Sequence, residues 1–206
     1  MSSSREDIKK LESEVMLRLS EKRFQHTLGV CRAATEICEL CGFDFVNEAQ
    51  CAALLHDIAK EYPKSELISM ISAEGFSLDE EDILSDGVLH SFAAVYVIKH
   101  DFPDFATKDI LSAVYNHTVG APDMSLFDEV IFLSDFIEDT RRHAPCIELR
   151  KYFFDNAKRG AFSENIKLLH DASARSIDHT LKSLNDRNLP INSKCILTRN
   201  ALLSKI

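Results

Sequence analysis

Four histidines and two aspartates are the side chains most able to do chemistry in this sequence, because imidazole and carboxylate groups bind divalent metal ions. They are spread along the chain at His26, His56, Asp57, His90, His117 and Asp135. Each lies inside or at the end of a segment with helical periodicity, and ligands from separate helices can converge in the core of a bundle. Imidazole binds iron, zinc or manganese, and a carboxylate can bridge two such ions. The set therefore suits a pair of first-row divalent metals.

The adjacent pair His56 and Asp57 is the most informative part of this pattern. A histidine alone in a helix is more often an ordinary surface or core residue than a ligand. Here, however, an imidazole and a carboxylate interrupt a run of alanine, leucine and isoleucine residues. Burying a charge in such surroundings is costly unless it is compensated, and a metal ion compensates it. Asp135 repeats the pattern in another apolar segment, where the alternative is a buried salt bridge, although no cation follows before Arg141.

The six cysteines do not indicate a second metal site. Cys38 and Cys41 form a C-x-x-C pair, but a structural zinc site would need two further thiolates or histidines at similar spacing, and no second pair exists. Without an export signal, disulfides are not expected either. We expect the pair to be buried in a helix as small apolar side chains.

The elements that must position these residues are predicted to be helices. The sequence has only 6 Gly and 5 Pro, and alternating β-branched runs are missing. Apolar residues recur at three- and four-residue steps up to Gly42, Asn47 is expected to cap the next helix, and a further helix follows Ser65 and ends at Gly75. Later helices are predicted over residues 89–99, 107–115, 126–139, 147–156 and 164–184, with all five prolines between helices.

This organisation predicts an all-α protein with one helical bundle domain, residues 1–187, followed by a polar and loosely packed tail, residues 188–206. A chain of 206 residues can bury a core of its own. No apolar run is long enough to cross a membrane, and residues 1–7 do not resemble a secretory signal, so we expect a cytoplasmic protein. The net charge of −9 disfavours nucleic acid as a partner but allows a small phosphorylated substrate beside bound metals. Both a monomer and a homodimer remain open.

The order His, His-Asp, His, His, Asp resembles the HD phosphohydrolase superfamily. Within it, the local sequence is similar to the bacterial symmetrical bis(5′-nucleosyl)-tetraphosphatases. Five blocks carry the resemblance: 23–27, 55–60, 89–90, 117–124, and 134–138 continuing to Arg141. They occur in the family's order and cover the chain from about residue 20 to 145. A fainter similarity to the family's tail lies around residues 197–200.

The resemblance implies a dinuclear metal site in the core cleft of the bundle. His26, His56, Asp57 and Asp135 would hold one metal, and His90 and His117 the second, with Asp57 as the bridge. Iron is the first choice of metal, with manganese and zinc as alternatives. The expected reaction is cleavage of diadenosine tetraphosphate to two ADP by a metal-activated hydroxide, which requires no nucleophilic side chain.

The catalytic residues are then Asp57, His90, His117 and Lys60. The residues expected to contact substrate are Arg23, Lys60, Thr118, Gly120 and Arg141. The arginines would bind phosphate through paired N–H donors, and Gly120 would let substrate approach closely. Lys60 lies one helical turn after His56, and its alternative is an ordinary exposed lysine.

The sequence departs from the family pattern beside the predicted metal ligands, at Ala121, Asp123 and Asp139 and in the bulkier stretch 91–94. These positions concern substrate contacts. Two alternatives therefore stay open: an HD phosphohydrolase acting on another nucleotide, such as a nucleoside triphosphate or a guanosine alarmone, and a nucleotide-sensing HD module without turnover. The second alternative predicts a missing metal ligand, and none is missing.

Overall fold

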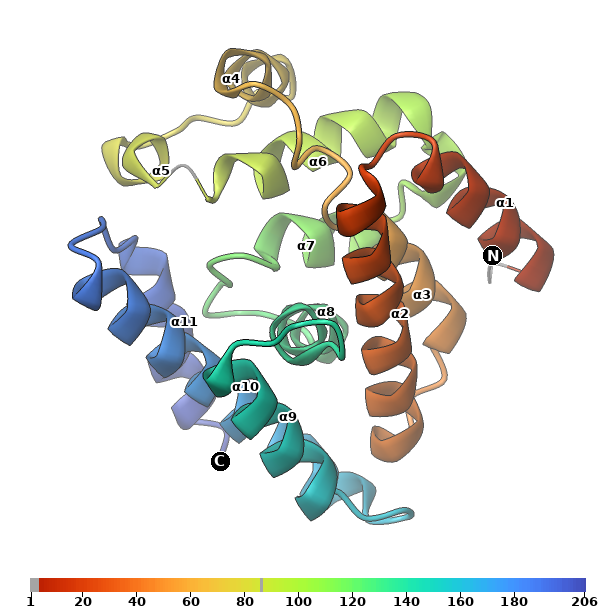
Figure 1. Cartoon of the computed structure of the whole chain (residues 1–206), viewed down its shortest axis with the longest axis vertical. Coiled ribbons are helices and arrows are strands. Elements are labelled where there is room, and N and C mark those ends of the chain that lie inside the picture. The colour runs from red at the N-terminus through yellow and green to blue at the C-terminus, as the bar shows by residue number, and fades with distance from the viewer. Residues whose placement is uncertain (1–3, 86) are drawn as a thin grey trace.

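Eleven α-helices and one short 3-10 helix form the secondary structure of the described residues, 4–85 and 87–206, in this computed structural model (Figure 1). In chain order they are α1 (Arg5–Met16), α2 (Glu21–Cys41), α3 (Val46–Leu55), α4 (Lys64–Ala73), α5 (Glu80–Leu84), α6 (Leu89–Asp101), η1 (Pro103–Phe105), α7 (Lys108–Asn116), α8 (Leu126–Ile137), α9 (Ala144–Asn156), α10 (Phe162–Asp186) and α11 (Ser193–Leu203). No strand occurs in this part of the chain. The predicted all-α fold is therefore confirmed. Residues 1–7 were expected not to form a secretory signal, and residues 1–3 of this segment lie outside the described residues.

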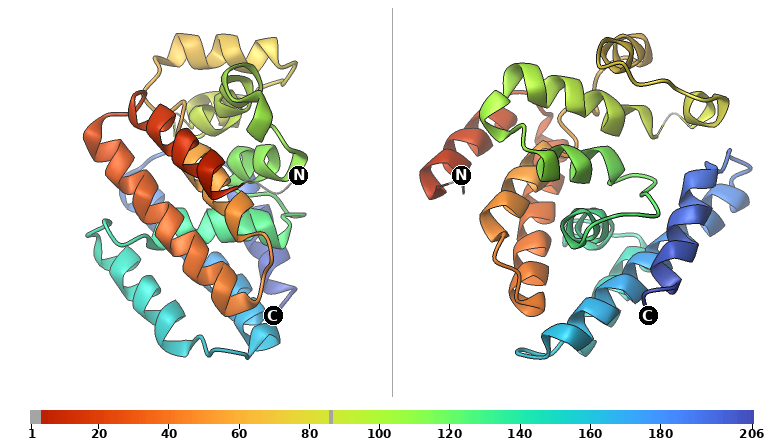
Figure 2. Two further views of the ribbon diagram at one scale, coloured as in Figure 1. Left: turned by 90° about the vertical axis from the view of Figure 1, so that its right-hand side faces the viewer. Right: turned by 180° about the vertical axis from the view of Figure 1, so that it is seen from behind.

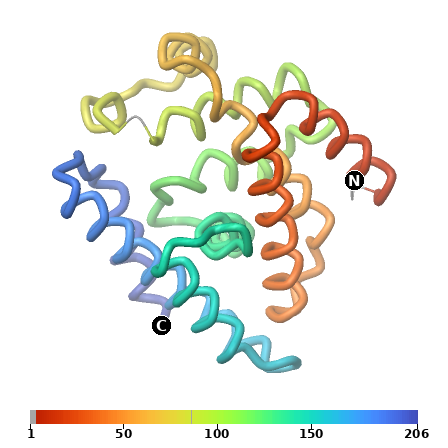
Figure 3. Tube along the Cα trace, in the orientation of Figure 1, coloured from red at the N-terminus to blue at the C-terminus, as the bar shows by residue number. Residues whose placement is uncertain are grey.

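Helix α8 lies at the centre of the bundle. Figure 1 shows it nearly end-on, and the view from behind in Figure 2 and the Cα trace in Figure 3 show the same arrangement. It packs against α2, α7 and α10, and its side chains Val130, Ile131, Leu133 and Ile137 are fully buried. A helix with neighbours on several sides is apolar around most of its circumference. This explains why the segment around Asp135 has so few polar residues.

Short-range signals determine where the helices near the centre begin and end. The Ser20 hydroxyl accepts a hydrogen bond from the Arg23 amide at the start of α2, and Gly42 ends that helix with a φ of 73°. Ser125 and Asp128 form a capping box at the start of α8. A polar side chain at such a position satisfies amide groups that have no partner within the helix. The predicted helix stop at Gly42 is confirmed.

Several predicted boundaries differ from the structure. Helix α3 begins at Val46 after Phe45, so Asn47 lies in its first turn and is not the cap. Pro145 lies in the first turn of α9, not between helices, because a proline there lacks only an amide that would be unpaired anyway. Helices α1 and α5 were not predicted, although α1 has buried residues at helical spacing and a capping box.

The carboxyl-terminal segment is not loosely packed, so that expectation is wrong. Helix α11 packs along α10 and buries Cys195, Thr198 and Leu202. At its start, the Lys194 ammonium lies 2.6 and 2.7 Å from the two oxygens of Asp82, a buried carboxylate on α5. The segment thus closes one side of the bundle.

The six cysteines, all within the described residues, form no disulfide bond. Cys38 and Cys41 are buried on α2, and burial raises the pKa of both thiols to about 12. The expectation of a buried apolar pair is confirmed. None of the described helices is both long and apolar enough to cross a membrane.

Candidate metal centre

All six predicted metal ligands come together where five helices meet. His26 lies on α2, His90 on α6 and Asp135 on α8. His56 and His117 each occupy the first position after a helix, α3 and α7 respectively. The sequence spacing of these residues therefore reflects their places on separate helices around one cluster.

Asp57 lies between the two halves of this cluster. Its Oδ2 atom is 3.6 Å from His26 Nε2 and 3.4 Å from His56 Nε2. Its Oδ1 atom is 3.0 Å from His90 Nε2 and 3.8 Å from His117 Nε2. The side chain is almost completely buried. One carboxylate therefore presents a different oxygen to each pair of histidines.

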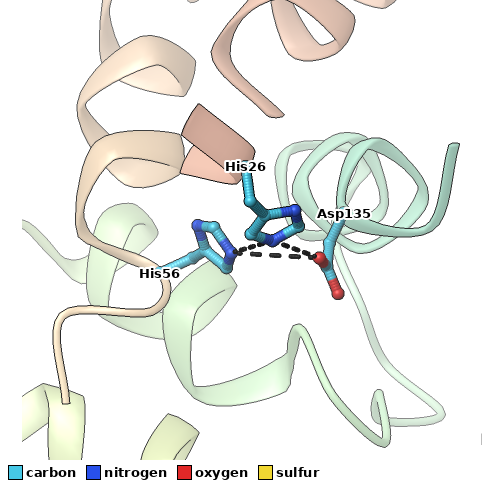
Figure 4. A group of neighbouring side chains, drawn as sticks. All are labelled: His26, His56 and Asp135. Carbon is cyan, nitrogen blue, oxygen red and sulfur yellow. Dashed lines mark hydrogen bonds and ion pairs between the residues drawn. The ribbon is translucent and has the colours of Figure 1, made fainter. Parts of the chain in front are cut away.

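Asp135 completes the first half. Its Oδ1 atom lies 3.0 Å from His26 Nε2 and 3.9 Å from His56 Nε2, and the two imidazole nitrogens are 3.3 Å apart (Figure 4). Ligand atoms that are each about 2.0–2.2 Å from one ion lie roughly 3.0–3.6 Å from one another. Most of the observed separations fall in or near this range, so the residues fit a divalent metal.

Two groups of ligand atoms are compact enough to surround an ion: His26, His56 and Asp135, and His56, Asp57 and His117. His90 adjoins the second group, because its Nε2 atom lies 3.0 Å from His117 Nε2. His56 therefore belongs to both groups in this structure, whereas the sequence analysis assigned it to the first metal only.

Backbone carbonyls orient two of the imidazole rings. His56 Nδ1 lies 2.7 Å from the carbonyl oxygen of Ala53, and His117 Nδ1 lies 2.6 Å from that of Val114. A carbonyl only accepts, so each Nδ1 must carry the proton and donate it. The lone pair of each Nε2 then faces the cluster, which is the state in which imidazole binds a metal.

A carboxylate that the sequence analysis did not assign orients His26. The Oε1 atom of the fully buried Glu138 lies 3.2 Å from His26 Nδ1. Glu138 also accepts hydrogen bonds from the Thr140 amide at 2.5 Å and the Thr140 hydroxyl at 2.7 Å. Gly29 provides the space, because a Cβ atom there would lie 2.2 Å from Glu138 Oε2. Glu138 is in the fifth similar sequence block, but only the fold shows which imidazole it contacts.

Four of the six cluster residues, Asp57, Asp135, His90 and His117, are in the protonation states that bind a metal ion, whereas for His26 the hydrogen bonds to Asp135 and Glu138 outweigh burial and raise the pKa to about 9. Burial alone would raise the pKa of Asp57, but His56 and the other imidazoles outweigh it and hold that pKa well below its usual range. Arg141 and His26 do the same for Asp135. Burial lowers the pKa of His90 to about 3 and also lowers that of His117, so both rings are neutral. Neutral imidazoles and ionised carboxylates are the forms that bind metals.

Three cations surround the carboxylates. Arg23 Nη1 lies 2.7 Å from Asp57 Oδ2, and Arg141 Nη2 lies 2.5 Å from Asp135 Oδ1. Lys60 Nζ lies 3.2 Å from the His90 ring nitrogens, and burial lowers its pKa. All three line a small cavity of about 190 Å³ over the cluster, which we call the metal cavity. Lys60 is therefore not an ordinary exposed lysine.

Thr118 and Gly120 differ in their placement. Thr118 lines the metal cavity beside His117. Gly120 is buried with a φ of 72°, and a Cβ atom there would lie 2.4 Å from the Thr198 side chain on α11. The structure thus gives a packing reason for this glycine. Asp139, one of the departures from the family pattern, lies on the surface, where Arg32 donates to both of its oxygens.

Comparison with known proteins agrees with this arrangement. The HD domain family model matches residues 23–139, which contain every histidine and aspartate of the cluster. The chain belongs to the HD domain family.

Individual relatives extend the similarity over nearly the whole chain. A protein of Halalkalibacterium halodurans named symmetrical bis(5′-nucleosyl)-tetraphosphatase is 33% identical over 187 residues, covering 90% of this chain and 91% of the relative. A Bacillus subtilis protein of the same name is 32% identical, covering 92% and 94%. A crystal structure from Clostridium acetobutylicum, described as a predicted HD superfamily hydrolase involved in NAD metabolism, is 31% identical with a TM-score of 0.82 and covers 96% of this chain and 97% of its own.

Proposed function

We propose that this HD hydrolase binds two divalent metal ions, with iron as the preferred metal, and cleaves diadenosine tetraphosphate symmetrically to two molecules of ADP. Two relatives have names that state the symmetrical activity, and their similarity to this chain extends over more than nine-tenths of each relative. The placement of Asp57, with one oxygen toward each pair of histidines, is the observation that carries the proposal.

The geometry of Asp57 supports two adjacent metal positions. His26, His56 and Asp135 would hold one ion, and His90 and His117 the other, with Asp57 between them. When bound, such ions lower the pKa of a coordinated water and neutralise charge on phosphate oxygens. Imidazole and carboxylate ligands also accept manganese and zinc, so availability contributes to the choice of metal.

The three cations give the metal cavity its affinity for polyphosphate. Arg23 and Arg141 are about one-third exposed, so their guanidinium groups can exchange a carboxylate partner for a phosphate oxygen. Guanidinium–phosphate contacts are charge-assisted hydrogen bonds. Lys60 adds a point charge beside His90. Together these residues would hold the central phosphates and stabilise the negative charge that develops during the reaction.

In the proposed reaction a water oxygen bonds to one of the two central phosphorus atoms. The central P–O–P bridge breaks, and the bridging oxygen leaves with the second ADP. Each turnover therefore consumes one water and places its oxygen in one of the two ADP molecules. No side chain of the protein forms a covalent intermediate.

Product analysis in ¹⁸O-labelled water tests this proposal. Metal-loaded protein should convert diadenosine tetraphosphate to ADP alone, with one labelled oxygen per two ADP and none in adenosine. ATP plus AMP would refute symmetric cleavage. No cleavage of the dinucleotide, together with rapid hydrolysis of nucleoside triphosphates or guanosine tetraphosphate, would favour the other nucleotide hydrolases. Absence of any nucleotide hydrolysis would favour the sensing module.

A further inference from the structure

The connection between α7 and α8 begins at a predicted metal ligand and extends to the last helix of the chain. His117 is its first residue, and the next residue, Thr118, lines the metal cavity. Figures 1 and 2 show this connection, residues 117–125, reaching from the centre of the bundle toward α11. We call it the α7–α8 loop. Contacts between this loop and α11 therefore bear on the placement of His117.

A hydrogen-bonded turn encloses His117 and Thr118. The Gly120 amide donates a hydrogen bond to the Asn116 carbonyl at 2.8 Å, which closes the turn around these two residues. Gly120 has a φ of 72°, the left-handed conformation in which a glycine ends a helix. The position of the His117 imidazole therefore depends on the peptide unit between Val119 and Gly120, because the N–H of this unit makes the closing bond.

The carbonyl of the same peptide unit contacts Thr198 on α11. The Thr198 hydroxyl oxygen lies 3.1 Å from the Val119 carbonyl oxygen and 2.7 Å from the Lys194 carbonyl oxygen, so its one proton is shared between two acceptors. The Lys194 carbonyl lies inside α11, where a backbone amide is its regular partner. Val119 is buried and lies outside any helix, so its carbonyl depends more on the Thr198 hydroxyl.

Two further contacts hold the α7–α8 loop against the carboxyl-terminal segment. Thr198 is fully buried, and its methyl carbon would lie 2.4 Å from a Cβ atom at Gly120, so the two backbones approach closely. At the other end of the loop, Lys205 Nζ lies 3.2 Å from the Met124 carbonyl oxygen and 2.8 Å from the buried carboxylate of Glu129 on α8. The loop is thus fixed near its start and near its end.

We propose that Thr198 is a positioning residue for the metal centre: its hydroxyl fixes the peptide unit between Val119 and Gly120, and through it the His117 imidazole. This inference rests on the proposed function, because it assigns a residue to holding a predicted metal ligand. Thr198 is not among the described residues that line the metal cavity, so it acts through the loop. A positioning role also accounts for residues 197–200, where the sequence resembles the family's tail.

Removing the hydroxyl while keeping the shape of the side chain is the most direct test. Thr198→Val keeps the volume and loses the donor, whereas Thr198→Ser keeps the donor and loses the methyl group beside Gly120. Calorimetric titration of the apo-protein with Mn²⁺ measures the metal affinity. We expect Thr198→Val to weaken Mn²⁺ binding roughly 2- to 10-fold, the effect of one lost hydrogen bond.

Two variants separate positioning from a loss of packing. Thr198→Ser should be less stable in urea than the unmodified protein but should bind Mn²⁺ equally well. Arg199→Ala, which removes the next side chain on α11 from a surface ion pair, is the control and should also bind Mn²⁺ normally. Thr198→Ala lacks the donor and adds no bulk beside Gly120, so it replaces Thr198→Val if valine disturbs folding, with the same expected weakening.

A double-mutant cycle shows whether Thr198 acts through His117. In a His117→Ala background the imidazole is already lost, so Thr198→Val should change the Mn²⁺ affinity no further. An equal weakening with and without the His117 imidazole would indicate a general loss of packing and would overturn the inference.

Hydrogen exchange of the Gly120 amide, followed by NMR in the metal-free protein, tests the first step by itself. Because this amide closes the turn at Asn116, Thr198→Val should speed its exchange, whereas Thr198→Ser and Arg199→Ala should leave it close to that of the unmodified protein. Either unchanged exchange or unchanged Mn²⁺ affinity in Thr198→Val would refute the positioning role.

The cleavage assay separates this inference from the proposed function. Cleavage of diadenosine tetraphosphate by the unmodified protein, with Mn²⁺ affinity unaffected by Thr198→Val, would refute the positioning role alone. Weaker Mn²⁺ binding in Thr198→Val, with no cleavage by the unmodified protein, would refute the proposed reaction and support the positioning role.

Discussion

Replacing Gly29 by alanine should disturb the metal centre by displacing Glu138, the carboxylate that contacts His26. In the interior of an exposed helix this replacement is usually stabilising, by about 1 kcal/mol. Here the new Cβ atom would lie 2.2 Å from Glu138 Oε2 and 3.0 Å from its carboxyl carbon. Glu138 is fully buried, so its carboxylate cannot move into solvent without opening the packing between α2 and the end of α8.

The magnitude follows from the contacts that the displaced carboxylate would lose. Glu138 accepts two hydrogen bonds from Thr140 and contacts His26 Nδ1. Loss of one bond to a charged group costs about 1.5–3 kcal/mol, which exceeds the helix gain and leaves a net destabilisation of about 0.5–2 kcal/mol. A partner that orients a metal-binding histidine contributes about 10- to 100-fold in metal affinity. Gly29→Ala should therefore lower both the free energy of unfolding and the affinity for metal.

Urea denaturation of the apo-protein and competition of the metal with a chelator measure these two quantities. Gly87→Ala is the control, because a Cβ atom there would meet nothing within 4 Å. In a Glu138→Ala background the clash is absent, so Gly29→Ala should cost nothing further, as a double-mutant cycle would reveal. A Gly29→Ala protein that is more stable than the unmodified protein and binds metal equally well would refute this reasoning.

Three further outcomes follow from the site and from α11. Asp57→Ala should retain less than half of the metal bound by the unmodified protein in elemental analysis, since its two oxygens face different histidine pairs; equal metal content would contradict a bridging role. Arg141→Ala should lower kcat/KM for diadenosine tetraphosphate roughly 10- to 150-fold through a lost charge-assisted contact, and Arg199→Ala, in a surface ion pair, should change it little. Lys194→Ala should lower the free energy of unfolding in urea by about 1–3 kcal/mol, because it removes the cation from a buried carboxylate. The exposed ion pair of Lys182 should contribute only about 0.3–0.5 kcal/mol, so an equal effect of Lys182→Ala would count against this explanation.

The candidate ligands could be predicted from sequence because they are ionisable residues in segments that are otherwise apolar. His56 and Asp57 lie in an alanine- and leucine-rich segment, and the structure buries that segment completely. The helices were predictable for the same reason, since apolar residues at helical spacing on α6 and α7 face the core. Local sequence therefore predicted that His56 and Asp57 are buried, whereas the grouping of the ligands around Asp57 depends on how separate helices pack.

Other features required tertiary information or a weaker signal. Glu138 contacts His26, 112 positions earlier in the chain, so no local pattern indicates the pairing. Helix α11 buries Cys195, Thr198 and Leu202 at helical spacing, but its polar residues obscured this stripe. The surface position of Asp139 is explained by Arg32, a partner from α2 that only the fold reveals.

The order of the helices along the chain has a consequence for biosynthesis. Every residue of the His/Asp cluster precedes residue 136, whereas α10 and α11 follow it. A protein synthesised from its amino terminus tends to organise its earlier segments first. The cluster residues are therefore synthesised before the helix that contributes Ser176 and Thr180 to the metal cavity. The metal cavity is closed on that side only once α10 has been made, so access to the cluster narrows as synthesis proceeds past residue 180.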